Sequence, residues 1–114
     1  MLQLNLDQHY LIDTSVIDII TRYIISYTDI DAPLIEIGAG KGALTQRLLN
    51  NLRSVIALEL DPGNCEELEQ LKANYQLLQI YQTDALNWLK DNKTEDPNVL
   101  KYVVGNIPYS IAEP

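Results

Sequence analysis

The sequence predicts an α/β fold built on a parallel sheet. Short apolar runs that suit buried strands alternate along the chain with segments of helical periodicity. A glycine-rich turn follows the first of these runs, and a polar residue follows each of the others. Ligands of a parallel sheet bind beyond the carboxyl ends of its strands, so we expect these residues to gather at one edge.

The elements follow in order, as far as periodicity and turn signals define them. They are a helix at 14–27, a turn at 29–33, a strand at 34–37, a helix at 43–51, a strand at 55–58, a helix opening at 61–62, a strand at 77–81, a short helix at 85–90, a polar loop at 91–98 and a strand at 102–104.

The first two helices are predicted from apolar spacing. In the first, apolar residues fall at 16, 19, 20, 23, 24 and 27, and Asp13 or Thr14 suits the N-cap. In the second, leucines 44, 48, 49 and 52 share one side.

The later elements follow from other signals. The run at 55–58 is apolar throughout, which is typical of a strand buried on both faces. Asp61-Pro62 opens the third helix, because proline is tolerated in a first turn, and Leu68 and Leu71 are its core contacts.

Length and composition limit the class of protein. The chain has 114 residues, room for one domain with a modest core, and 46% of them are hydrophobic. No apolar run approaches the roughly 18 residues of a membrane span, and residues 1–7 lack a signal-peptide pattern. The single Cys65 cannot form an internal disulfide and has no His or Cys clustered nearby. We therefore expect a cytoplasmic protein with no metal site and no membrane partner.

The charge is strongly acidic. The formal net charge is −8 and the pI is about 4.4. Phosphate contacts need Lys and Arg, so any nucleic acid would need positive surface from elsewhere. The acidity also fits a domain that is simply kept soluble.

The turn at 38–42, Gly38-Ala39-Gly40-Lys41-Gly42, predicts a site for a nucleoside-type cofactor. Glycines let the backbone approach a ligand, and the following helix offers free N–H groups. The pattern also fits a dinucleotide loop or a tight turn alone. Since Lys41 is not followed by Ser or Thr, a phosphate-binding NTPase loop is disfavoured.

Two acidic residues follow the next strands. Glu59 lies 21 residues after Gly38, where a carboxylate can accept hydrogen bonds from both ribose hydroxyls. Asp84, just before Ala85, can accept the amino group of an adenine. Each has a structural alternative, a solvated strand end for Glu59 and a helix N-cap for Asp84.

The segment Asn106-Ile107-Pro108-Tyr109 follows the fourth strand and has the most specific chemistry. The side-chain carbonyl of Asn106 and the backbone carbonyl near Pro108 can accept hydrogen bonds from the two N–H groups of an adenine amino group. These hydrogen bonds favour a tetrahedral geometry at the amino nitrogen. Tyr109 offers a ring for stacking the base. The alternative is a proline turn with Tyr109 as packing. The cofactor and base loops together indicate a nucleic-acid amino methyltransferase.

Five motifs in order resemble the ribosomal RNA adenine dimethyltransferase family over nearly the whole chain. They are residues 7–13 (Asp-Gln-His-Tyr-Leu-Ile-Asp), 36–42, 57–61, 83–85 and 105–111. His9 and Tyr10 stand where many members have Asn and Phe. The resemblance implies a Rossmann-like fold, with strand order 3-2-1-4, that uses S-adenosylmethionine.

The resemblance also implies activity and site residues. The family transfers two methyl groups to the amino nitrogen of adenosines in small-subunit ribosomal RNA. By position, the resemblance passes cofactor contacts to His9, Leu11, Gly38, Glu59, Asp84 and Asn106. We also expect Gly40 and Ala85 to contact the cofactor, and we expect catalytic roles for Asn106, Pro108 and Tyr109 from the chemistry of their loop.

The departure from the family is length. Members continue through further strands and a helical RNA-binding domain, so residues 1–114 are expected to be the N-terminal portion of one cofactor-binding domain, truncated after strand four. An exposed edge on that strand favours self-association. Two alternatives stay open: a non-catalytic relative that binds the cofactor or a partner, and a nicotinamide-dependent oxidoreductase.

Overall fold

The structure is a computed structural model, and it describes residues 14–92 and 102–105. Its elements are α2 (Thr14–Tyr27), β1 (Leu34–Ile37), α3 (Ala43–Asn50), β2 (Val55–Glu59), α4 (Pro62–Lys72), β3 (Leu78–Gln82), α5 (Ala85–Asp91) and β4 (Tyr102–Gly105). The predicted α/β fold is confirmed, with element bounds that differ by a residue or so. Asp13, a predicted N-cap, and residues 93–98 of the predicted polar loop lie outside the described residues.

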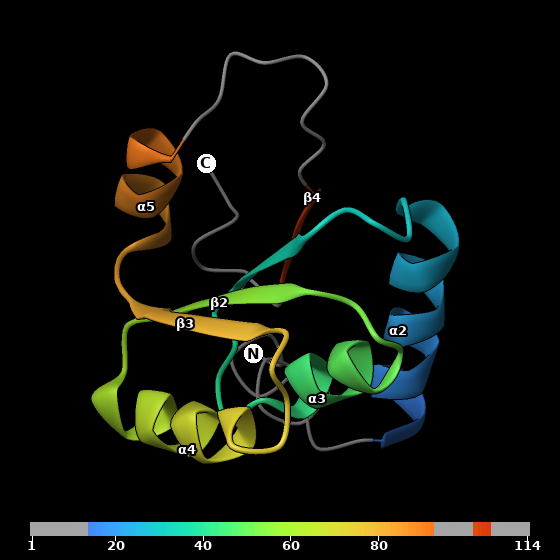
Figure 1. Ribbon diagram of the computed structural model, residues 1–114, viewed down its shortest axis with the longest axis horizontal. Helices are drawn as coiled ribbons and strands as arrows, with labels where there is room; N and C mark the ends of the chain where they lie inside the picture. Colours follow the sequence, from blue (N-terminus) through green and yellow to red (C-terminus); the bar gives the residue numbers. More distant parts are fainter. Residues whose placement is uncertain (1–13, 93–101, 106–114) are drawn as a thin grey trace, which may run out of the picture.

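The four described strands form one parallel sheet in the order β3-β2-β1-β4, as the resemblance implies. The central strand β1 pairs Ile37 with Leu58 of β2 on one side and with Gly105 of β4 on the other. Helices α3 and α4 lie on one side of the sheet and α5 on the other (Figure 1). All four strands therefore end at the same edge.

One apolar core joins the sheet to α2, α3 and α4. Its fully buried members come from every one of these elements and include Ile17, Leu34, Leu48, Val55, Ala57, Leu68 and Leu78. Burial of each such aliphatic side chain contributes roughly 1.5–3 kcal/mol before entropy is counted. The helical residues of the core come from α2, α3 and α4, and none of the described residues of α5 is buried.

The bounds of α2 agree with the prediction, but its buried face does not. Ile17 and Thr21 are the buried residues, whereas Tyr23 and Tyr27 are exposed and stack with ring centroids 5.1 Å apart. Thr21 can occupy an inward position because its hydroxyl donates to the carbonyl of Ile17 at 2.7 Å. A count of apolar residues alone misses a buried threonine of this kind.

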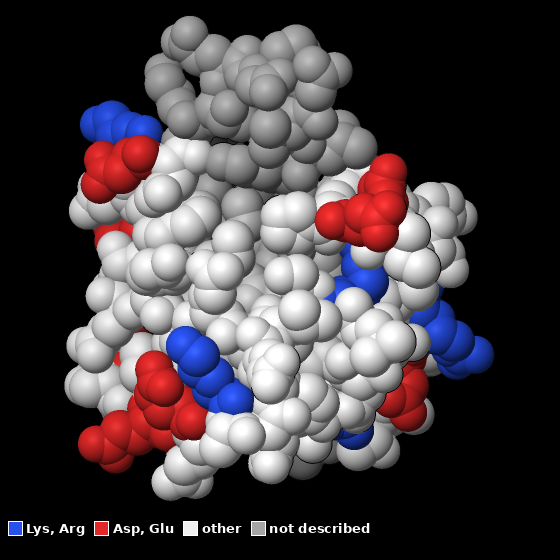
Figure 2. All heavy atoms as spheres, viewed as in Figure 1, with Lys and Arg blue, Asp and Glu red and all other residues white. Residues whose placement is uncertain are grey.

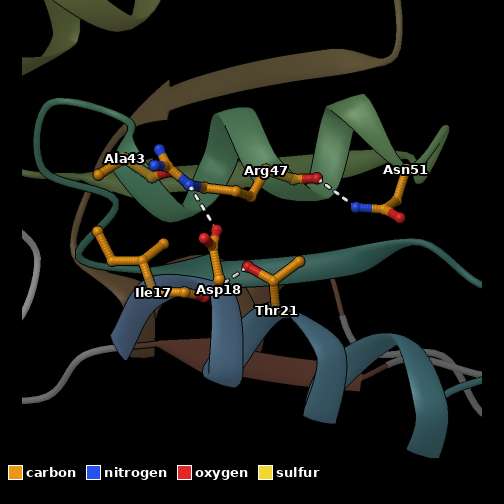
Figure 3. A network of polar contacts seen from close by, with 6 residues as sticks. All are labelled: Ile17, Asp18, Thr21, Ala43, Arg47 and Asn51. Atoms are coloured by element: carbon orange, nitrogen blue, oxygen red, sulfur yellow. Dashed lines mark hydrogen bonds and ion pairs between the residues drawn. The ribbon is translucent and has the colours of Figure 1, made fainter. Parts of the chain in front are cut away.

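An ion pair connects α2 with α3, and two further hydrogen bonds lie within α3 and at its C-terminal end (Figure 3). Arg47 of α3 donates its Nε–H to Asp18 of α2 at 3.3 Å and its Nη1–H to the carbonyl of Ala43 at 3.2 Å. The side-chain amide of Asn51 donates to the carbonyl of Arg47 at 2.8 Å. A solvent-facing pair of this kind contributes at most about 1 kcal/mol, so apolar packing holds the two helices together.

The end of α3 corrects the prediction for Leu52. This residue is 81% exposed, not on the core side, because the helix ends at Asn50 and Leu52 takes a left-handed conformation with φ 61°. Arg53 is buried in its place. Its guanidinium donates to the hydroxyl of Thr28 at 2.8 Å and to the carbonyls of Asp29 and Ala32, which ties this turn to the connection between α2 and β1.

We predict that Gly105→Ala destabilises the protein by roughly 2 kcal/mol or more, the scale of overpacking in a core. A Cβ at Gly105 would lie 2.6 Å from the carbonyl oxygen of Ile37, a backbone atom of the central strand that cannot rotate away. Chemical denaturation measures the loss. Gly63→Ala is the matched control, because among the described residues its Cβ would meet only the flexible side chain of Asp61, at 3.2 Å. Equal stability of both variants would contradict this account of β4.

Candidate functional site

The carboxyl edge of the sheet brings together the segments that the sequence singles out. The turn after β1 continues the pairing with β2, since the N–H of Gly38 donates to the carbonyl of Leu58 at 2.9 Å. The N–H of Thr83, after β3, donates to the carbonyl of Glu59 at 3.2 Å. Gly105 ends β4 beside Ile37. The predicted gathering at one edge is therefore confirmed for these described segments.

The glycine turn has one closed side and one open side. Gly42, with φ 98°, begins α3, and a Cβ there would lie 3.0 Å from Leu71 and 3.2 Å from Leu68 of α4. A Cβ at Gly40, with φ 61°, would meet among the described residues only the carbonyl oxygen of Gly38, at 4.0 Å. Gly42 thus serves helix packing, whereas the described residues leave the backbone of Gly40 uncovered on the side where a Cβ would point.

Glu59 is held by the backbone on two sides. Its Oε1 accepts the N–H of Gly40 at 2.8 Å, and its Oε2 accepts the N–H of Asp61 at 2.9 Å. The half-buried carboxylate is therefore held by two backbone donors, and its role as a ligand stays a prediction. A carboxylate has about four acceptor positions, so two remain for the hydroxyls of a ribose.

Asp84 shows the capping geometry that was its structural alternative. It is the N-cap of α5, and its Oδ1 accepts the N–H of Leu86 at 2.8 Å. Its Oδ2 accepts no hydrogen bond from the described residues, 14–92 and 102–105, and the side chain is exposed. Ala85 opens α5 directly beside it. A ligand role for the pair stays a prediction.

The other predicted site residues cannot be placed. His9, Leu11, Asn106, Pro108 and Tyr109 lie outside the described residues. Their roles remain predictions.

Glu36 is a buried acidic residue near the glycine turn whose burial the sequence analysis did not predict. It lies in β1, it is 3% exposed, and its Oε1 accepts the hydroxyl proton of Thr45 on α3. Burial raises the pKa of Glu36 from 4.5 to about 7; the hydrogen bond from Thr45 acts against this, and the negative charge of Glu59 adds to it. A carboxyl inside an otherwise apolar strand was the available signal, since unpaired acids are seldom buried.

The described part of the chain shows no other feature of a chemical centre. None of its His, Cys, Asp and Glu side chains form a group of three that could hold a metal ion. None of the described helices is both long and apolar enough to cross a membrane. The face shown in Figure 2 carries scattered basic side chains and no continuous basic patch among its coloured residues.

Comparison with known proteins identifies the family. The family model described as ribosomal RNA adenine dimethylase matches residues 2–114. The chain belongs to this family. Among curated members, "Ribosomal RNA small subunit methyltransferase A" of Chromohalobacter salexigens is 38% identical over 110 residues, which cover 94% of this chain and 38% of that protein. The "Probable ribosomal RNA small subunit methyltransferase A" of Methanosarcina acetivorans is 38% identical over 107 residues, 93% of this chain and 36% of that protein.

Solved structures agree on the fold of this adenine dimethylase family member. The 23S rRNA methyltransferase ErmE superimposes with a TM-score of 0.67 at 28% identity, over 88% of this chain and 38% of that one. The glycopeptide N-methyltransferase MtfA, complexed with S-adenosylmethionine, gives a TM-score of 0.52 at 24% identity, over 62% of this chain and 32% of that one. The predicted Rossmann-like methyltransferase fold is thereby confirmed. The chain spans a little over a third of the length of its curated relatives.

We predict that Glu36 makes the protein less stable as pH rises. The unfolded chain loses this proton near pH 4.5, but the folded chain keeps it to about pH 7. The stabilisation is therefore complete below pH 4.5 and is lost as pH rises to 7, by about 3 kcal/mol in all. Glu36→Gln, which cannot ionise, should remove this loss, so that it is more stable than the wild type at pH 8 and similar to it at pH 4.5.

Thermal unfolding of both proteins across this pH range measures the difference. Glu66→Gln is the control, because it removes the same charge from an exposed position on α4. A difference between wild type and Glu36→Gln that does not change with pH would show that Glu36 is ionised throughout.

Proposed function

We propose that the protein is an S-adenosylmethionine-dependent enzyme that dimethylates the amino group of adenosines in small-subunit ribosomal RNA. Membership in the adenine dimethylase family and the names of its relatives support this substrate. The structural observation that carries the proposal is the backbone of Gly40, which the described residues leave uncovered, with the carboxylate of Glu59 hydrogen-bonded to it. This arrangement suits a nucleoside with a free ribose.

The proposed cofactor contacts come from several segments. Glu59 accepts the ribose hydroxyls, and the backbone at Gly38 and Gly40 lies against the methionine part of the cofactor. Asp84 and Ala85 contact the adenine, with the free Oδ2 of Asp84 as the acceptor for its amino group. His9, Leu11 and Asn106 complete the site by family resemblance.

The proposed reaction is a direct transfer. The adenine amino nitrogen attacks the methyl carbon of the sulfonium, a nitrogen–carbon bond forms as the carbon–sulfur bond breaks, and S-adenosylhomocysteine leaves. The nitrogen then loses a proton to solvent. Carbonyls of Asn106 and Pro108 accept the amino N–H bonds and Tyr109 stacks on the base, so the protein contributes orientation and electrostatics.

RNA binding requires positive charge that this chain does not supply. With a net charge of −8, it should be repelled by phosphate. We propose that other parts of the full-length protein, working with the ribosomal subunit in the cytoplasm, hold the RNA. The acidity also supports a second candidate for the chain by itself, a module that binds the cofactor or a partner without turnover. A nicotinamide oxidoreductase is disfavoured by the family match.

Methyl transfer to small-subunit RNA tests the function. In the full-length protein, Asn106→Ala should lower turnover far more than Tyr109→Phe, because the phenylalanine keeps the stacking ring. A thermal-shift comparison of S-adenosylhomocysteine with NAD tests the cofactor independently. Equal losses in the two variants would show that the loop is misassigned, and stabilisation by NAD alone would overturn the reaction class.

We predict that Glu59→Ala weakens S-adenosylhomocysteine binding by roughly 1–3 kcal/mol, the scale of hydrogen bonds to a charged group. Calorimetry measures the change. Glu59→Gln is a partial control: its amide oxygen can still accept the N–H of Gly40, but its amide nitrogen cannot accept the N–H of Asp61. An unchanged dissociation constant for Glu59→Ala would show that Glu59 only orders the backbone and does not bind the ligand.

We propose that the 114-residue chain by itself associates through β4. In the described sheet, β4 pairs with β1 on one side and with no described strand on the other, and Val103 is 50% exposed. Open strand edges readily pair with other chains. Light scattering should therefore report a mass above that of a monomer, and Val103→Lys should reduce it. A monodisperse monomer would refute this proposal.

A further inference from the structure

Two carboxyl groups lie next to the glycine turn, and the proposed function uses only one of them. Glu59 contacts the turn directly through Gly40. Glu36 lies in β1 two residues before the turn begins, and it is close enough to Glu59 for the charge of Glu59 to oppose its ionisation. Glu36 is thus buried in the strand that leads into the glycine turn, hydrogen-bonded at one oxygen to a neutral hydroxyl.

The surroundings leave Glu36 without a cation in the described structure. Its register partners are Ala57 on β2 and Val104 on β4, neither of which titrates. From α3 it receives the hydroxyl of Thr45, while Arg47 of the same helix points to Asp18 instead (Figure 3). The charged group that acts on it is Glu59, of like sign.

A cationic ligand at this edge would change that balance. The sulfonium of S-adenosylmethionine carries a positive charge that the product, S-adenosylhomocysteine, has lost. In a poorly solvated site, a nearby positive charge favours the ionised carboxyl, whereas a neutral sulfur does not. The ammonium and carboxylate of the methionine part are common to both molecules and cannot distinguish them.

We propose that Glu36 is a positioning residue that gives up its proton when the sulfonium cofactor binds and takes it back when the neutral product remains. The proton passes to and from solvent, and no covalent bond changes. This inference rests on the proposed function and deepens it. Glu36 would hold the substrate form of the cofactor more tightly than the spent form, which favours product release.

The test is calorimetry of both ligands with the full-length protein, at pH values from 6 to 8 and in buffers of different ionisation enthalpy. The ratio of S-adenosylmethionine affinity to S-adenosylhomocysteine affinity should rise about fivefold over this range if the sulfonium makes ionisation of Glu36 tenfold easier. About 0.4 proton should be released per S-adenosylmethionine bound at pH 7. Binding of S-adenosylhomocysteine should release much less.

Three variants separate this role from a structural one. In Glu36→Gln the affinity ratio should not change with pH, while both ligands still bind. Thr45→Val removes the hydrogen bond that assists ionisation, so the rise in the ratio should move to higher pH. Glu66→Gln, exposed on α4, should behave as the wild type.

The outcomes distinguish this inference from the proposed function. If both ligands bind but the ratio is flat with pH in the wild type, or still rises in Glu36→Gln, the inference is wrong and the cofactor assignment stands. If neither ligand binds, both are wrong.

Discussion

The carboxylate of Glu59 connects the parts of the structure on which the candidate site depends. One oxygen accepts the N–H of Gly40, in the turn after β1, and the other accepts the N–H of Asp61 before α4. Asp61 then caps α4 by accepting the N–H of Asn64 at 2.8 Å. The backbone carbonyl of Glu59 accepts the N–H of Thr83. One residue therefore orders the glycine turn, the start of α4 and the end of β3.

This arrangement is compatible with the ligand role proposed for Glu59. A carboxylate that depended on the ligand for its orientation would lose side-chain entropy on binding. Glu59 has already lost that freedom to its two backbone donors, and it keeps acceptor positions free. The turn and the carboxylate are consequently ordered together, before any ligand is present, and a substitution at Glu59 affects both.

Local patterns were sufficient to predict the elements but not their buried polar partners. The bounds of α2 and the alternation of strands follow from periodicity and turn residues within short windows. The pairing of Glu36 with Thr45 and the burial of Arg53 depend on contacts 9 and 21–25 residues apart. No local pattern specifies such contacts, because they exist only after the helices have packed. The exposed Leu52 was misplaced for the same reason, since the chain buries Arg53 there instead.

Glu36 and Arg53 show two different solutions to burying an ionisable side chain. A guanidinium does not give up its proton in proteins, so Arg53 must find acceptors, and it takes one hydroxyl and two carbonyls while its Nε–H has no partner among the described residues. A carboxyl can instead accept a proton, and burial drives Glu36 to do so. The charge of Arg53 is thus constant, away from the glycine turn, whereas the charge beside the turn can change near neutral pH. Among the described residues next to the glycine turn, Glu36 is thus the one whose pKa burial raises to about 7.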